Sequence, residues 1–537
     1  MSAGPGSLQY HGLRAPGEDR SMFIEPPFAE IGGLIEENVR LRAGYDYDFQ
    51  GQSLQVLAAE ARRDLLAEAR RYTAAYRPVA PWAEDPDSRI FLAGHQPELF
   101  HPGVWFKNVV LGTLARQHRA AAVNLVIDSD TARHAALPTP GGSADDPHVE
   151  LIPMDRPAPP LPFEERRVLD RRSFAEFGRR VAERIAPLVA DPLVGQYWEL
   201  VLERKRHTDN LGQCLAQARH QLEGRWGLQT LEIPQSWVCR NRSFCRLIAH
   251  LLAHLPRFRE TYNAAVEEYR RAHRIRNAAH PVPDLAADGP WLEAPLWLWT
   301  EDDPQRRRLF ARPDGGEILL SDRRTLELRL PLCAGGDAGK AVEQLAALAR
   351  RGIKIRSRAL ATTLWARLVL GDLFVHGIGG AKYDQVTDLI IERFFGLKPP
   401  GIVVVSATLH LPIDRSPAAP ARRAEIDQEL RDLTYHPERY VDQSTDEVRE
   451  LIAAKWRSIQ SPRTAGNARA RWRAIRRMNE ALQPRVARRR DGLLQLQAET
   501  ARRLRAERIL AWREYGFCLY PERTLRDFWE RLLPKNV

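Results

Sequence analysis

The chain has 537 residues, of which 44% are hydrophobic and 28% are charged, and its formal net charge is +11. This composition excludes a disordered chain, and the length predicts two or three domains. No window of about 18 apolar residues exists and residues 1–20 lack the apolar core of a signal peptide, so we expect a cytoplasmic protein with no membrane anchor.

The first informative elements are a helix, a strand and a second helix. Residues 54–76 predict an amphipathic helix, with apolar side chains on one side and charges on the other. An apolar strand over 90–93 then runs into the turn Gly94-His95-Gln96-Pro97, and a helix follows Pro102-Gly103. A strand, a glycine turn and a helix N-terminus in this order suit an anion or a nucleotide.

A second strand end lies close behind. The apolar run 123–127 stops at Asp128-Ser129-Asp130, and such carboxylates can hold a metal or orient an amine or hydroxyl. Ligands of open α/β sheets collect at the carboxyl ends of strands. Both motifs therefore predict an active site at the mouth of an α/β sheet.

The middle of the chain carries weaker signals. Residues 138–162 are rich in Pro, Gly and Asp and predict a loop or insertion, residues 173–273 are dominated by helical patterns, and residues 290–322 are β-rich. The tryptophans of this last patch are interpreted as core or as a domain seam, with a stacking platform for a base or sugar as the alternative.

The cysteines give little evidence for a metal site. All five are widely spread without a CxxC pair, which disfavours a disulfide framework. The series Cys239, Cys245, His250 and His254 could hold zinc, but its spacing is loose and the surrounding leucines indicate an ordinary buried helix.

The second candidate constellation follows Arg356-Ser357-Arg358 and an apolar stretch over 364–373. It reads His376-Gly377-Ile378-Gly379-Gly380-Ala381-Lys382-Tyr383-Asp384, and we expect a helix over 385–395 directly after it. Backbone amides at such a place can hold an anion, while Lys382 and His376 add charge or a proton. The alternative is a set of ordinary turn glycines.

The positive charge is concentrated near the C-terminus, where residues 461–515 contain 15 arginines against 5 acidic residues. Residues 444–459 predict a helix opened by the capping box Ser444-Thr445-Asp446-Glu447, and an Arg-rich helix follows Ser461-Pro462. Two such helices suggest a coiled-coil hairpin or a dimer arm, whose register slips near Gln483-Pro484. The arginines are interpreted as a solvated face, with nucleic-acid binding as the alternative.

Together these motifs resemble the bacillithiol-biosynthesis cysteine-adding enzyme (BshC) family. The family has a strand ending in a Gly-(Gln/His)-Gln motif and a lysine-bearing helix, which Gly94-His95-Gln96, Gly103 and Lys107 match. Its next strand ends in an Asp/His cluster, as do Asp128, Asp130 and His134. Residues 375–383 resemble its glycine motif with a tyrosine, Ser406-Ala407-Thr408 its Ser-x-Thr strand end, and 442–515 and 521–533 its coiled coil and closing helix.

The resemblance implies an α/β fold with a Rossmann-like core related to class I aminoacyl-tRNA synthetases and nucleotidylyltransferases, helical insertions and a C-terminal coiled-coil arm. We therefore expect an N-terminal helical segment (1–88), the first half of the core (89–165), a helical insertion (166–280), the second half of the core with the β-rich patch and the glycine motif (281–420), the coiled-coil arm (421–515) and a closing helix (516–537).

The resemblance also implies a reaction. The family joins cysteine to the amine of a glucosaminyl-malate in the synthesis of a thiol cofactor, which implies a nucleotide-dependent ligase using ATP with Mg²⁺ and a homodimer formed through the coiled coil. His95, Asp128 and Asp130 become the catalytic candidates, with His95 and Gln96 facing phosphate oxygens. The nucleotide and substrate candidates are Gly94, Gln96, Gly103, Lys107, His376, Gly377, Gly379, Gly380, Lys382, Tyr383, Asp384, Ser406 and Thr408.

Departures from the family leave the substrate open. Gly380 stands where the family has a glutamate, and Lys382 and Asp384 are additional charges. Another amine-bearing small molecule therefore fits as well as the bacillithiol precursor. Three other functions stay open: a non-catalytic small-molecule or nucleotide-binding relative, a nucleic-acid-binding protein that uses the Arg-rich arm, and a metal-dependent hydrolase built on His95, Asp128, Asp130 and His134.

Overall fold

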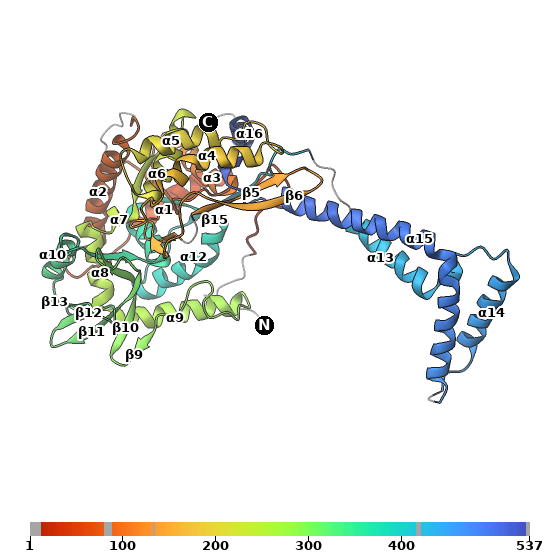
Figure 1. Cartoon of the computed structure of the whole chain (residues 1–537). Coiled ribbons are helices and arrows are strands. Elements are labelled where there is room, and N and C mark those ends of the chain that lie inside the picture. The colour runs from red at the N-terminus through yellow and green to blue at the C-terminus, as the bar shows by residue number, and fades with distance from the viewer. Residues whose placement is uncertain (1–11, 80–87, 133–134, 415–419, 465, 533–537) are drawn as a thin grey trace. The chain divides into compact units, whose positions relative to one another are not determined.

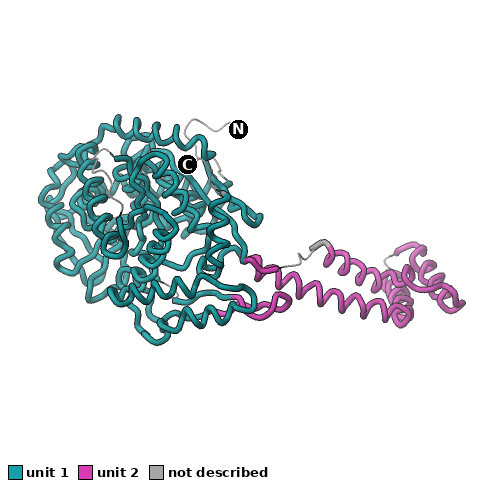
Figure 2. The backbone as a smooth tube through the Cα atoms, turned by 90° about the horizontal axis from the view of Figure 1, so that it is seen from above, with its two compact units in different colours: residues 1–139, 151–411, 513–537 teal, residues 140–150, 412–512 magenta. Residues whose placement is uncertain are grey.

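The structure, a computed structural model, describes residues 12–79, 88–132, 135–414, 420–464 and 466–532 (Figure 1). The chain divides into two compact units, shown in Figure 2. The first comprises residues 1–139, 151–411 and 513–537, and the second comprises residues 140–150 and 412–512. Among the described residues, no helix has an apolar stretch long enough to cross a bilayer.

The first unit is an α/β structure built on a mostly parallel six-stranded sheet. Its strands lie in the order β1 (Ser21–Glu25), β16 (Ile402–Thr408), β15 (Leu373–Gly377), β2 (Ile90–His95), β3 (Ala121–Val126) and β8 (Leu231–Pro234). Only β1 is antiparallel to its neighbour. The central strands are buried on both faces, which explains why they appear in the sequence as apolar runs without alternation.

The strand order reverses next to β2. The chain passes from β2 to β3 and β8 on one side, and later to β15 and β16 on the other. At such a reversal the connections leave the sheet in opposite directions and open a crevice outside the carboxyl ends of the strands. This crevice lies between the ends of β2 and β15, where both glycine motifs occur.

Two helices begin at this crevice. α3 (Pro102–Gln117) has His101 as its N-cap residue, whose Nδ1 accepts a hydrogen bond from the backbone N–H of Gly103. Most of α3 is buried, and its first turn touches β16: a Cβ on Gly103 would lie 2.0 Å from the carbonyl oxygen of Ala407. α12 (Ile378–Ile390) starts inside the second motif, so the prediction of a helix beginning at Gln385 was wrong by two turns.

The predicted β-rich patch is confirmed and is larger than expected. A five-stranded antiparallel sheet has the order β13 (Glu327–Leu330), β12 (Glu317–Ser321), β11 (Arg307–Asp314), β10 (Trp291–Thr300) and β14 (Ile353–Ser357), and β9 (Ala287–Asp288) pairs with β10. Figure 1 shows these strands beside α9.

The helical regions follow the sequence patterns closely. The helix predicted over residues 54–76 is α2 (Leu54–Ala74), with Ser53 as its N-cap residue. The helices that complete the first unit are α1 (Ile31–Ala43), α4 (Arg171–Ile185), α5 (Val194–Lys205), α6 (Leu211–Arg225), α7 (Gln235–Val238), α8 (Arg242–Ala253), α9 (Leu255–Ala272), α10 (Gly339–Leu348), α11 (Ala359–Trp365) and α16 (Glu522–Leu532). Residues 166–280, expected to be a helical insertion, also supply the four-residue strand β8, whose sequence Leu-Glu-Ile-Pro is not a continuous apolar run.

Residues 138–162 are more regular than the predicted loop. β5 (Ala136–Gly142) pairs with β6 (Pro147–Pro153), and β7 (Leu161–Pro162) pairs with β4 (Thr131–Ala132). Prolines and glycines therefore lie within the strands of short two-stranded sheets, whose edge positions tolerate them.

The described residues of the second unit form three helices rather than the two predicted: α13 (Pro420–Tyr435), α14 (Asp446–Gln460) and α15 (Ala468–Leu510). α13 and α14 both pack against α15, which continues through Pro484. The predicted capping box is absent: Thr445 is the N-cap residue of α14 without a side-chain bond, and the Ser444 hydroxyl donates to Asp442. Arg485 and Arg489 of α15 form ion pairs with Glu447 and Glu429.

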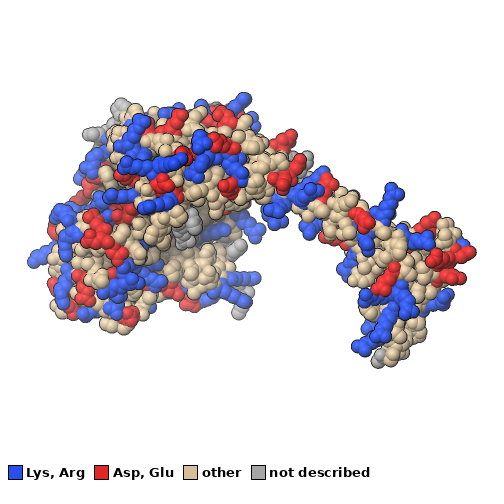
Figure 3. Space-filling view, in the orientation of Figure 1, with Lys and Arg blue, Asp and Glu red and all other residues tan. Residues whose placement is uncertain are grey.

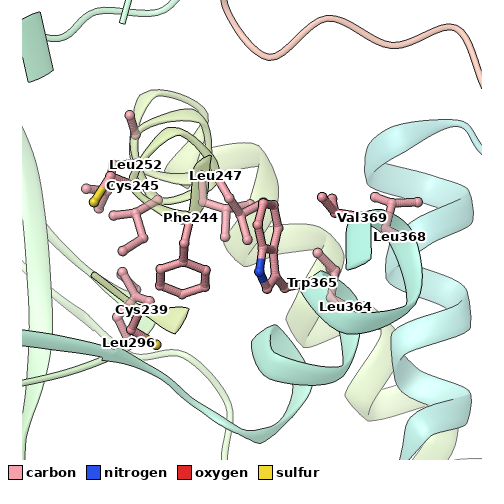
Figure 4. Packing of buried hydrophobic residues seen from close by; sticks show 14 of the residues in the cluster. Cys239, Phe244, Cys245, Leu247, Leu252, Leu296, Leu364, Trp365, Leu368 and Val369 are labelled. Carbon is pink, nitrogen blue, oxygen red and sulfur yellow. The ribbon is translucent and has the colours of Figure 1, made fainter. Parts of the chain in front are cut away.

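Basic and acidic side chains are interspersed over both units on the face seen in Figure 3. Inside the first unit, a large apolar core connects the helices to both sheets. Figure 4 shows part of it, in which Phe244 of α8 and Trp365 of α11 lie edge to face with ring centroids 5.7 Å apart. Cys239 and Cys245 are buried in the same cluster, which is the ordinary environment of a structural cysteine.

Candidate functional site

A cleft of about 760 Å³ opens at the carboxyl ends of β2 and β15. Most of the predicted site residues line it, although they come from motifs nearly 300 positions apart. They are Gly94, His95, Gln96, Gly103, Lys107, Asp130, His376, Gly377, Gly379, Gly380, Lys382, Tyr383 and Ser406. Asp128, Asp384 and Thr408 lie outside the lining, and His134 lies outside the described residues. The reversal of strand order accounts for the convergence.

His95 ends β2 and is half-buried at the cleft. Its Nδ1 lies 3.0 Å from the carbonyl oxygen of Gln96, and since a carbonyl can only accept, Nδ1 carries the hydrogen. Burial, reinforced by the charge of Lys107, lowers the pKa of His95 to about 3. At neutral pH the side chain is therefore uncharged, and its Nε2 offers a lone pair rather than a proton.

Lys107 lies on α3, one helical turn beyond Gly103. It is only 4% exposed although it lines the cleft, and its Nζ donates to the carbonyl oxygen of Gly94. Burial, together with the nearby charge of Arg219, lowers the pKa of Lys107 to about 7. An anion in the cleft would favour its charged form.

The carboxylate of Asp130 is held by donors on both sides. Nε2 of Gln96 donates to Oδ2 at 2.9 Å, while the guanidinium of Arg306 and the backbone N–H of Thr131 reach Oδ1 at 3.0 and 2.7 Å. Both oxygens are thus engaged within the protein. Asp130 fits the task of holding Gln96 and Arg306 in place better than that of a free metal ligand.

Asp128 faces away from the cleft. It accepts hydrogen bonds from the backbone N–H and the hydroxyl of Ser236, at 2.9 and 2.5 Å. Burial, followed by the charge of Glu164, raises the pKa of Asp128 to about 7. Asp128 therefore connects the end of β3 to the residues that follow β8. It does not line the cleft itself, whereas its neighbours Ser129 and Asp130 do.

The described residues contain one group of side chains close enough to share a metal ion: His220, Glu223 and Glu232. Arg219 already forms ion pairs with both glutamates, so its guanidinium offsets part of the negative charge that a metal ion would otherwise balance. The predicted zinc series of Cys239, Cys245, His250 and His254 does not form such a group among the residues described. Nε2 of its His250 lies 2.8 Å from the hydroxyl oxygen of Tyr47, a structural contact.

One glycine of the second motif, Gly380, packs against His376 near the end of β15. Gly377 is the N-cap residue of α12, and Gly379 and Gly380 lie in its first turn. A Cβ on Gly380 would lie 1.8 Å from Cε1 of His376, so the absence of a side chain makes room for the imidazole. Burial lowers the pKa of His376 to about 4, partly opposed by Asp384.

Two predicted binding residues are used inside the protein. Asp384 is fully buried and pairs with Arg367 at 2.8 Å. The hydroxyl of Thr408 donates to the carbonyl oxygen of Pro16 at 2.6 Å. In each case the partner lies far away in the sequence, and no local pattern identifies it.

Several lining residues were not among the predicted site residues. The indole of Trp297 lies between the guanidinium groups of Arg306 and Arg358, at 4.5 and 4.6 Å from the ring centroid. Arg513, from the C-terminal segment, also lines the cleft. The sequence shows Trp297 and Arg306 within one β-rich patch, but nothing in it places this patch over the strand ends.

A second cavity, of about 620 Å³, lies between α3, residues 226–229 and α16, and none of the predicted site residues lines it. Most of the predicted site residues therefore lie at the first cleft and none at this second cavity. No family model matches the sequence, and no curated protein matches it.

Proposed function

We propose that this protein is a carbon–nitrogen ligase similar to the BshC family, which joins cysteine or a related amino acid to an amine on an anionic small molecule. The observation that carries the proposal is the convergence of the two glycine motifs in one cleft. A structural role for those glycines alone does not account for His95, Lys107, His376 and Lys382 in the same lining.

The sheet supports a Rossmann-like core. If the parallel strands are numbered in chain order from β2, they lie in the order 3-2-1-4-5 across the sheet. This is the order of nucleotide-binding α/β folds, in which the ligand binds where the order reverses. The cleft occupies that position. Because one such fold hosts many chemistries, the reaction has to be argued from the side chains.

The charges of the lining favour an anionic ligand. Lys107, Arg306, Arg358, Lys382 and Arg513 are basic, against two acidic residues, Asp130 and Glu514. Asp130 is paired with Arg306, and Arg358 is paired with the buried Glu293. The basic surplus therefore consists of Lys107, Lys382 and Arg513 against Glu514. A nucleotide or a phosphorylated acid suits this surplus better than a neutral molecule does.

The neutral imidazole of His95 suits the orientation of an attacking amine. An amine attacks the carbonyl carbon of an activated carboxylate, the new C–N bond forms, and the activating group leaves with the electrons of its C–O bond. With a pKa of about 3, His95 is too weak a base to keep the proton of the attacking nitrogen, so its Nε2 can accept a hydrogen bond from the amine while the proton leaves with the departing phosphate. Lys107, which lines the cleft, can stabilise the negative charge on the oxygens.

ATP would supply the activation of the carboxylate, and the basic residues named above would hold its phosphates. Mg²⁺ fits this cleft only as an ion that arrives with the nucleotide, because both oxygens of Asp130 are occupied. No step is assigned to the metal. The arm remains the part of the chain expected to mediate a homodimer.

The proposal is tested by thermal unfolding with ATP, other nucleotides, cysteine and amino-sugar acids, followed by mass spectrometry of the products. We expect ATP to raise the unfolding temperature by several degrees and His95→Ala to abolish product formation while nucleotide binding persists. Glu150→Gln, an exposed substitution outside the cleft, serves as control.

Other outcomes would support the alternatives. Nucleotide binding without any product would indicate a non-catalytic relative. Stabilisation by single-stranded RNA alone, with a steep dependence on salt, would indicate nucleic-acid binding through the arm. Two arginines of α15 are already engaged in ion pairs with α13 and α14, which weakens that alternative.

A further inference from the structure

Arg513 reaches the cleft from a part of the chain that none of the motifs includes. It lies three positions after the end of α15, in the segment 513–537 that belongs to the first unit. Its Nη2 donates to the carbonyl oxygen of Ala407 at 2.9 Å and to the hydroxyl of Ser406 at 3.2 Å. These contacts fix the guanidinium at the end of β16.

One further donor of this guanidinium, the buried Nε, has no partner among the described residues. A guanidinium presents five N–H donors in a rigid fork that matches two oxygens of a carboxylate or phosphate. A buried donor without a partner is costly, which indicates that an acceptor belongs at this position.

The first turn of α3 lies beside the fork. Nη2 of Arg513 is 3.0 Å from the position that a Cβ on Gly103 would take, so the glycine permits this approach. Burial, with the charge of Arg513, lowers the pKa of the neighbouring His101 to about 4, so His101 adds no charge at neutral pH. Lys107 follows one turn further along the same helix and also lines the cleft.

We propose that Arg513 binds a phosphoryl group of the nucleotide substrate, together with Lys107 of α3. This inference rests on the proposed function and names the group that the cleft recognises. Two basic side chains in one cleft favour a group with more than one negative charge, which a phosphate carries and a single carboxylate does not.

The test compares ATP with adenosine, which lacks the phosphates, by isothermal titration calorimetry. Arg513→Gln should weaken ATP binding about 10- to 100-fold, the loss expected for a hydrogen bond to a charged group, and leave adenosine binding unchanged. The ATP affinity of Arg513→Lys should lie between those of the wild type and Arg513→Gln, because lysine keeps the positive charge but lacks the forked donors of a guanidinium. Arg505→Gln, an exposed arginine of α15, should bind ATP as the wild type does.

Each outcome of this experiment supports or contradicts phosphoryl binding by Arg513. Equal ATP affinity in Arg513→Gln and the wild type would overturn the proposal, and so would a parallel loss of ATP and adenosine binding, which indicates a purely structural role. A wild type that binds neither ATP nor pyrophosphate would also overturn it. Selective loss of ATP binding with no ligation product from any amine would support the phosphoryl site and contradict the ligase function alone.

Discussion

The imidazole of His376 occupies the space that a side chain on Gly380 would need. A Cβ at Gly380 would lie 1.8 Å from Cε1 and 2.2 Å from Nδ1 of the ring. A larger side chain at this position therefore cannot be accommodated while His376 keeps its position. The glycine and the histidine form one packed unit, and His376 lines the cleft.

Gly380→Ala should displace His376 and destabilise the fold. We expect a loss of about 1–3 kcal/mol in the free energy of unfolding, the usual cost of overpacking. Gly379→Ala is the matched control, since a Cβ there meets nothing within 4 Å and alanine favours a helix by up to about 1 kcal/mol. Urea denaturation measures both. Equal stability of the two variants would contradict the packing argument.

Gly103→Ala tests the contact between α3 and β16. Its Cβ would lie 2.0 Å from a backbone oxygen, that of Ala407, and a backbone atom cannot rotate away as a side chain can. We expect destabilisation of about 3 kcal/mol, at the upper end of overpacking costs. Gly377→Ala, with open space around its Cβ, should stay within about 0.5 kcal/mol of the wild type. A mild effect at Gly103 would show that α3 can shift away from the sheet.

The structural role of Asp384 is tested through its partner Arg367, which also contacts Asp388 at 2.6 Å. Asp384→Ala leaves a buried guanidinium without its buried partner and should cost roughly 3–5 kcal/mol. The side chain of Asp388 is 41% exposed, and Asp388→Ala should cost less than about 1 kcal/mol. Thermal and chemical unfolding measure the loss of stability in each variant. If Asp384→Ala folds normally and loses ligand binding, Asp384 is a binding residue after all.

The main features of the fold could be predicted from local patterns. Buried parallel strands appear as apolar runs and α2 as an amphipathic repeat, and both were confirmed. The pairing of β8 with β3 could not be predicted, because a four-residue run inside a helical region has no distinctive period. The start of α12 was misplaced because glycine is a poor helix former, and here tertiary packing around His376 overrides that preference.

The site was predictable where strand ends carried polar residues and glycines. His95 and His376 were selected on that basis and line one cleft. The functions of Asp384 and Arg513 depend on partners 17 and more than 100 positions away, and a single sequence contains no trace of such pairings. The sequence shows Arg513 only as one arginine of a basic segment, whereas the structure places it in the lining of the cleft.

The buried histidines predict an acid-sensitive fold. The pKa values of His95, His101 and His376 are lowered to about 3, 4 and 4, chiefly by burial, against an ordinary value of 6.5. Between pH 6.5 and 4 the unfolded chain therefore binds more protons than the folded chain, so stability falls as the pH falls. Each histidine contributes up to about 1.4 kcal/mol per pH unit.

His101→Asn isolates one of these contributions, because asparagine keeps an oxygen that can accept from the Gly103 N–H and cannot be protonated in this range. The slope of unfolding free energy against pH, measured by urea denaturation between pH 6.5 and 5, should become shallower by about 1 kcal/mol per unit. Above pH 7.5 the two curves should run parallel, since an imidazole is neutral in both states there. Parallel curves over the whole range would mean that His101 is protonated as readily in the folded chain as in the unfolded one, and that the cleft around it is open to water.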